Sequence, residues 1–225
     1  MASPGDEATI RWLERTLPVP DGRAPALFVL PPQPHAVVVF AVGPGSAVRS
    51  PRNEHLAGRL AERGYAAVLP ALVPPAAARL HAADVDVEGW RRRLAGVVDA
   101  VMANEELAGL PLALYAAGFA TAPALLLAEQ RDGIAALVLR HARPELVRGH
   151  LPHVVTPTLY VVGGRDPAAR ATAVETVAQM HVEAWTVVVP GATALFEEEG
   201  VLDALADAVI EWLDEHLLRR RRGAA

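Results

Sequence analysis

The sequence predicts an α/β protein with one doubly wound, mostly parallel sheet, helices on both faces and no cap domain. Short runs of β-branched and aliphatic residues alternate with longer helical patterns along most of the chain. The run at residues 35–42 is almost continuously apolar, as expected of a strand that is covered on both faces. Strict alternation of this kind indicates parallel strands joined by right-handed helical crossovers.

The expected elements follow in chain order. Residues 9–18 and 26–30 are expected to form an antiparallel hairpin, with turn chemistry at Pro20, Asp21 and Gly22. The other strands are expected at 35–42, 65–70, 112–117, 134–141, 158–162 and 185–189. The helices are expected at 53–63, 87–104, 120–130, 168–180 and 201–218. We therefore expect a single domain over residues 1–218 and a basic C-terminal tail over 219–225.

Composition excludes several classes of function. The chain has 225 residues, of which 52% are hydrophobic, enough for the core of one domain. The net charge of −5 argues against a nucleic-acid partner. The absence of cysteine excludes disulfides, thiolate metal sites and a cysteine nucleophile. Residues 1–10 are acidic and have no apolar segment typical of a signal peptide, so we expect a cytoplasmic protein.

Residues 107–128 carry no charge and are long enough to span a bilayer. Four residues interrupt this segment, namely Gly109, Pro111, Gly118 and Pro123. Such breakers favour a strand, a turn and the start of a helix over a membrane span. We therefore expect no membrane partner.

In open α/β sheets the ligand site lies beyond the carboxyl ends of the strands, here in the loops after Val42, Ala117, Val162 and Val189. Motifs in and around these loops occupy residues 38–41, 43, 45–46, 50–53, 107–112, 156–166, 190–193 and 195–198. Together they resemble the dienelactone hydrolase-like branch of the α/β-hydrolase superfamily, small bacterial members of which include some fused to phosphoribosyltransferase domains. The resemblance implies the α/β-hydrolase type of sheet and a serine hydrolase acting on esters.

The catalytic positions depart from that family. The family nucleophile lies in a Gly-x-Ser-x-Gly elbow, and here Gly118 stands at the serine position. Ala194 stands at the position of the family's general base, a histidine. Only the acid remains, as Asp166. The three serines, Ser3, Ser46 and Ser50, all precede the elbow, and Thr121 is the nearest hydroxyl beyond it, so we expect no intact catalytic residue.

The oxyanion loop has changed as well. The family pattern His-Gly-x-Gly is replaced at residues 42–45, where Gly43 is retained and Pro44 has no N–H to donate. The second family donor, the backbone N–H after the nucleophile, is retained at Phe119 beside a large ring. Asp166 is then either a relic acid or a turn residue before Pro167. The turn interpretation is favoured because no histidine is expected to remain for Asp166 to orient.

Four arginines are candidates for an anion-binding pocket near the helix that begins around Phe119: Arg49, Arg52, Arg140 and Arg143. The alternative is surface pairing within the chain, for example with Glu145. His141 lies beside Arg140 but does not match the family pattern. His150 and His153 could share a face but lack a nearby third ligand, so we expect neither a metal site nor a cofactor.

The leading hypothesis is a catalytically inactive hydrolase-fold protein that acts as a binding or partner subunit. It would form a homo-oligomer, pair with an active hydrolase or a phosphoribosyltransferase, or hold a small ligand in the vestigial cleft. The alternative is a dienelactone hydrolase-like esterase that uses a non-standard catalytic group. A third hypothesis is a purely structural subunit of an oligomer.

Overall fold

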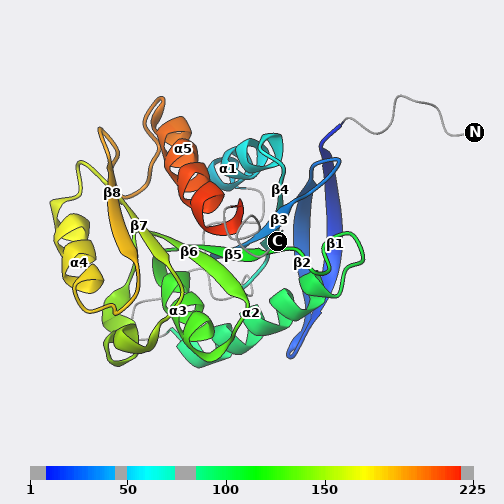
Figure 1. The fold of residues 1–225 in the computed structure, drawn as a ribbon, viewed down its shortest axis with the longest axis horizontal. Coiled ribbons are helices and arrows are strands. Elements are labelled where there is room, and N and C mark those ends of the chain that lie inside the picture. The colour runs from blue at the N-terminus through cyan, green and yellow to red at the C-terminus, as the bar shows by residue number, and fades with distance from the viewer. Residues whose placement is uncertain (1–8, 44–49, 74–84, 219–225) are drawn as a thin grey trace, which may run out of the picture.

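A computed structural model describes residues 9–43, 50–73 and 85–218. Three sequence-predicted features lie outside these ranges: Pro44 of the oxyanion loop, Arg49 of the arginine pocket and the C-terminal tail at 219–225. The described residues form one mostly parallel sheet with helices on both faces, which confirms the predicted fold class (Figure 1).

The sheet has eight strands in the order β1-β2-β4-β3-β5-β6-β7-β8. Their bounds are β1 (Arg11–Val19), β2 (Gly22–Leu30), β3 (Ala36–Val42), β4 (Tyr65–Pro70), β5 (Leu112–Ala117), β6 (Ile134–Arg140), β7 (Thr158–Gly163) and β8 (Ala184–Val189). The first two strands form the expected antiparallel hairpin, and β2 also runs antiparallel to β4. All other pairs are parallel, so the carboxyl ends of β3, β5, β6 and β7 meet along one edge.

Five helices cover the sheet: α1 (Pro51–Glu62), α2 (Val87–Met102), α3 (Thr121–Gln130), α4 (Pro167–Val177) and α5 (Val201–Leu213). A π-helical turn, η6 (Asp214–Leu218), follows α5. Figure 1 shows α1 and α5 on one face of the sheet and α2 and α3 on the other. The starts of α2 and α4 are capped by aspartates, since Asp86 accepts from the backbone N of Gly89 and Asp166 from that of Ala169.

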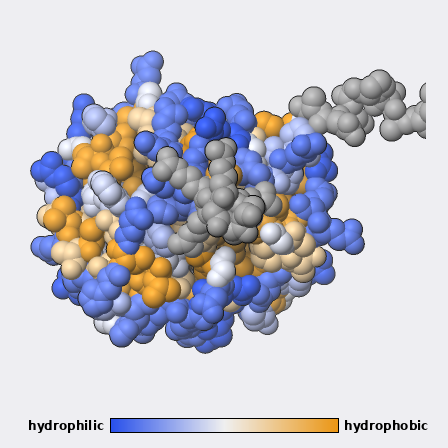
Figure 2. All heavy atoms as spheres, viewed as in Figure 1, coloured by the Kyte–Doolittle hydropathy of each residue, from blue (hydrophilic) through white to orange (hydrophobic). Residues whose placement is uncertain are grey.

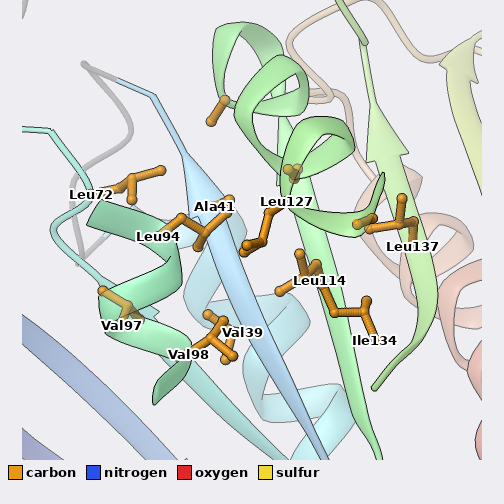
Figure 3. Close-up of a cluster of buried hydrophobic side chains, with 14 of the residues drawn as sticks. Val39, Ala41, Leu72, Leu94, Val97, Val98, Leu114, Leu127, Ile134 and Leu137 are labelled. Carbon is orange, nitrogen blue, oxygen red and sulfur yellow. The ribbon is translucent and has the colours of Figure 1, made fainter. Parts of the chain in front are cut away.

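Alternation along the strands divides the apolar side chains between two cores. In β3, Val37 and Val39 face the cluster beneath α2 and α3, while Val38 and Phe40 face the cluster beneath α1 and α5. Figure 3 shows part of the first cluster, where Leu94 and Val98 of α2 lie toward Ala41 and Val39 of β3. Both faces of the central strands are therefore buried, which is why their sequences are almost continuously apolar.

The uncharged segment at 107–128 forms β5, a short 3-10 turn η3 (Gly118–Ala120) and most of α3, as the sequence predicted. Within the described residues, no helix is long and apolar enough to cross a membrane. On the face of the molecule seen in Figure 2, hydrophilic residues are interspersed with apolar patches.

Candidate functional site

The turn between β5 and α3 keeps the sharp elbow geometry that the sequence predicted. Gly118 has a φ of +59°, in the left-handed region that glycine adopts without a steric penalty. A Cβ built on Gly118 would meet no described atom within 4 Å. The elbow therefore has room for a side chain at the position of the family serine, and the sequence supplies none.

Thr121, the nearest hydroxyl to the elbow, is fully buried and engaged on both sides. Its Oγ1 donates to the carbonyl oxygen of Gly118 at 2.7 Å and accepts from the backbone N of Arg143 at 3.0 Å. A hydroxyl has one hydrogen to donate, and that of Thr121 is already donated to a backbone carbonyl oxygen. Thr121 therefore does not replace the missing nucleophile.

The loop after β8 contains no histidine and is fixed by a hydrogen bond and by close backbone packing. The backbone N of Thr193 donates to Oε1 of Glu198 at 3.0 Å, and hydrogen bonding from Thr193 holds the pKa of Glu198 below its ordinary value. Gly163 approaches this loop so closely that a Cβ there would lie 2.5 Å from the carbonyl oxygen of Ala192. Backbone packing thus positions Ala194, whose methyl group has no acid–base chemistry.

Asp166 has two roles at the carboxyl end of β7. Its Oδ1 accepts from the backbone N of Ala169 at 3.0 Å, which makes Asp166 the N-cap of α4. Its Oδ2 lies 3.3 Å from Nδ1 of His141, a residue that directly follows β6. The expectation that no histidine remains for Asp166 was therefore wrong. The signal in the sequence was a histidine after one strand and an aspartate after the next, and β6 and β7 are neighbours in the sheet.

Arg140, the last residue of β6, is 7% exposed. Its Nε donates to the hydroxyl of Tyr115 at 2.9 Å, and Nη1 lies 3.4 Å from the carbonyl oxygen of Ala194. The guanidinium also lies 5.4 Å from the ring centroid of Phe196. Its hydrogen-bond acceptors are neutral, and no carboxylate among the described residues forms an ion pair with it. Arg140 is therefore a buried cation held by neutral groups.

The two other described arginines of the expected pocket pair with nearby acids. Arg143 pairs with Glu145, and its guanidinium lies 4.7 Å from the ring centroid of Phe119. Arg52 donates to the carbonyl oxygen of Leu195 and lies 3.2 Å from Glu197. Intrachain pairing thus occurs at both positions, and the pocket of four arginines remains a prediction.

Comparison with solved structures decides the family. A dienelactone hydrolase from Anabaena variabilis matches 92% of this chain and 99% of its own, with 30% identity and a TM-score of 0.86. The chain belongs to the dienelactone hydrolase-like branch of the α/β-hydrolases. Est1E from Butyrivibrio proteoclasticus shares the fold at 16% identity and a TM-score of 0.74, over 91% of this chain and 99% of its own. No protein-family model matches the chain.

A curated relative of this hydrolase-like chain comes from Mycobacterium tuberculosis and is named as a phosphoribosyl transferase. It is 36% identical over 189 residues, which are 84% of this chain and 43% of the relative. The chain therefore spans less than half the length of that relative, in keeping with the expected fusion of such hydrolase domains to phosphoribosyltransferase domains.

Family membership allows the residues around the elbow to be compared with the family's catalytic residues. Gly118 and Ala194 occupy the positions that the resemblance assigns to the nucleophile and the general base, while the acid position keeps Asp166. Phe119, beside the elbow, is half-buried and packs against the cluster beneath α2 and α3. Gly43 ends the described part of the oxyanion loop, immediately after β3.

The described residues contain no group of three or more histidine, aspartate or glutamate side chains that could hold a metal ion. His150, one of the two histidines weighed for such a site, instead lies with its Nδ1 2.8 Å from Oε2 of Glu129 on α3. Like His141 and Asp166, this pair places an imidazole beside a carboxylate, but at the shorter distance of a hydrogen bond and away from the elbow. It therefore provides an internal comparison for the pair at the site.

Proposed function

We propose that this chain is inactive as a serine hydrolase and is a binding protein that holds a small carboxylate beside the elbow. The observation that carries the proposal is Arg140, a nine-tenths-buried cation with neutral hydrogen-bond acceptors at the carboxyl edge of the sheet. A buried charge is costly unless it is paired, and a carboxylate would supply the missing negative charge. The planar guanidinium suits a carboxylate because it offers parallel N–H donors.

The proposed inactivity follows from the groups at the elbow. Covalent catalysis in this family needs a nucleophile in hydrogen-bond reach of a base, and Gly118 and Ala194 supply neither group. Thr121 is committed to the backbone on both sides. Because members of a triad act as a unit, the acid alone does not sustain the family's chemistry.

A partner role is part of the same proposal. The Mycobacterium tuberculosis relative carries this region within a longer chain, of which the match covers 43%. That arrangement supports a binding domain that works beside a second unit, and the name of the relative suggests a phosphoribosyltransferase as that unit. The ligand site and the partner are separate parts of the proposal, since the first depends on Arg140 and the second on the relative.

Isothermal titration calorimetry with sodium acetate, and with acetamide as the uncharged analogue, tests the ligand site. We expect acetate to bind and acetamide not to bind. Arg140→Met should abolish acetate binding, whereas Arg140→Lys should weaken it because the charge stays and the planar fork is lost. Arg131→Met is the matched control, since Arg131 pairs with Asp99 at 2.6 Å at the far end of α3. Equal binding of acetate and acetamide, or acetate binding that survives Arg140→Met, would contradict the proposal.

A further inference from the structure

The pair formed by His141 and Asp166 points to a function in addition to ligand binding. We propose that this pair is a general base that activates water for attack on an ester held at the elbow, without any covalent intermediate. The activity would differ from the family's serine chemistry in its nucleophile, which is water, and in the position of its histidine, which follows β6 instead of β8.

Backbone contacts hold His141 between the elbow and β7. The backbone N of His141 donates to the carbonyl oxygen of Val161 at 3.2 Å. Two residues on, the backbone N of Arg143 donates to Thr121, which in turn donates to Gly118. Ala117 and Arg140 are partners in neighbouring parallel strands about 4.8 Å apart, and Gly118 and His141 are the residues that directly follow them in the chain.

The imidazole of His141 lies against the carboxylate of Asp166. Nδ1 is 3.3 Å from Oδ2 of Asp166, so Nε2 is the ring nitrogen farther from that oxygen. The other oxygen of Asp166 accepts from the backbone N of Ala169, so the carboxylate has a defined direction. In the proposed reaction, this carboxylate faces the imidazole that takes the proton.

His141 also has a strained backbone. Its φ is +48°, which is uncommon for any residue with a side chain. Such a conformation persists only where the surrounding structure enforces it, and it is found preferentially at functional sites. The side chain is nevertheless 38% exposed, so a substrate can reach the imidazole from solvent.

The space above Gly118 provides the place for the reaction. A Cβ at this position would meet no described atom within 4 Å, and the proposed water takes the place that the family gives to its serine hydroxyl. Nε2 of His141 takes a proton from water, and the water oxygen bonds to the ester carbonyl carbon while the π pair moves to the carbonyl oxygen. The adduct then collapses, the bond to the leaving oxygen breaks, and that oxygen takes the proton from His141. Ester and water become acid and alcohol, and the imidazole ends neutral.

The pair of His150 and Glu129 is a close control. Its side chains are 48% and 17% exposed, against 38% and 17% for His141 and Asp166. Among the described residues, a third partly exposed imidazole, that of His55, lies beside the carboxylate of Asp203. Of these three histidines, only His141 directly follows the strand that pairs with the elbow strand β5. Any activity that arises from imidazole chemistry alone would depend on all three histidines to a similar degree.

The experiment measures phenyl acetate hydrolysis by the full chain and its variants, with heat-denatured protein as background and intact mass recorded during turnover. We expect saturable hydrolysis by the wild type, a loss of about 100-fold in kcat/KM for His141→Gln, and no change for His150→Gln. Asp166→Asn keeps a helix-capping residue and should lower kcat while KM stays the same, because Asp166 acts as a positioning residue. No acetylated protein should accumulate.

Three results would overturn the inference: no hydrolysis above background, equal rates for His141→Gln and wild type, or acetyl-protein during turnover. If Asp166→Asn lowers the thermal midpoint, its activity cannot be interpreted. The comparison of hydrolysis by His141→Gln and His150→Gln then tests the inference, since neither histidine caps a helix. The proposed binding function is tested independently, by the acetate titration of the wild type and of the Arg140 variants. Acetate binding does not depend on turnover, so either proposal can be contradicted without the other.

Discussion

The hydroxyl of Thr121 donates to the carbonyl oxygen of Gly118 at 2.7 Å and also accepts from the backbone N of Arg143. One buried side chain therefore ties the elbow to the loop that carries His141. This hydrogen-bonded connection joins the elbow to the loop after β6, although the chain has Gly118 and Ala194 where the family has its serine and histidine.

Thr121→Val should destabilise the protein, because the isosteric side chain leaves the backbone N–H of Arg143 without its acceptor. A buried donor left unsatisfied costs about 1–3 kcal/mol. Urea denaturation measures the free energy of unfolding. The matched control is Thr176→Val on α4, since Thr176 is 2% exposed and its hydroxyl donates one turn back to Thr172. A cost no larger at Thr121 than at Thr176 would contradict this role.

Gly118→Ala should lower the free energy of unfolding by about 1–2 kcal/mol, the cost of the left-handed conformation for a residue with a Cβ. Sterics add nothing, because a Cβ there meets no described atom within 4 Å. Gly43→Ala is the control, since Gly43 has equal room and no positive φ. Chemical denaturation of both variants separates backbone strain from crowding, and a stabilising Gly118→Ala would show that the elbow is not strained.

Tyr65→Phe should destabilise the protein at neutral pH. The hydroxyl of Tyr65 donates to Oδ1 of Asp214 at 2.6 Å, which joins β4 to the turn after α5. A hydrogen bond to a charged group contributes about 1.5–3 kcal/mol. Tyr160→Phe should cost less, because the hydroxyl of Tyr160 donates to a weak acceptor, the sulfur of Met180, at 3.8 Å. Equal costs in urea denaturation would contradict the importance of Asp214.

Stability should also fall in alkaline solution. Burial, followed by the hydrogen bond to Asp214, raises the pKa of Tyr65 well above its ordinary value. The folded state therefore holds the Tyr65 proton more tightly than the unfolded chain, so this contribution is complete below the unfolded pKa of about 10 and is lost as pH rises beyond it. Unfolding measured from pH 8 to 11 should show a shallower decline for Tyr65→Phe than for wild type. Parallel declines would contradict the prediction.

Local sequence patterns were sufficient for most of the fold. Apolar runs such as the one that forms β3 located the strands, because dry central strands need apolar side chains on both faces. The elbow was also predictable, since the family resemblance places it between the strand that forms β5 and the helix that forms α3. The expected helix at 87–104 ends at Met102 and the expected helix at 168–180 ends at Val177, because local patterns define helix ends only loosely.

The interactions within the site were harder to predict. The contact of His141 with Asp166 depends on the neighbouring ends of β6 and β7, and it was overlooked because the family places its histidine after β8. The bonding of Arg52 to Leu195 joins residues that are 143 positions apart. Such contacts depend on how loops meet at the sheet edge, which hydrophobic periodicity does not specify.

The most direct test of the central claim, that the chain keeps a hydrolase scaffold without a covalent nucleophile, is its intact mass after exposure to a fluorophosphonate. We expect the wild type to remain unmodified, as should Gly118→Ser alone, because a serine without its base is a poor nucleophile. The double variant Gly118→Ser with Ala194→His is the positive comparison, since it restores the serine and the histidine while the acid position keeps Asp166. Stoichiometric labelling of the wild-type protein would contradict the account.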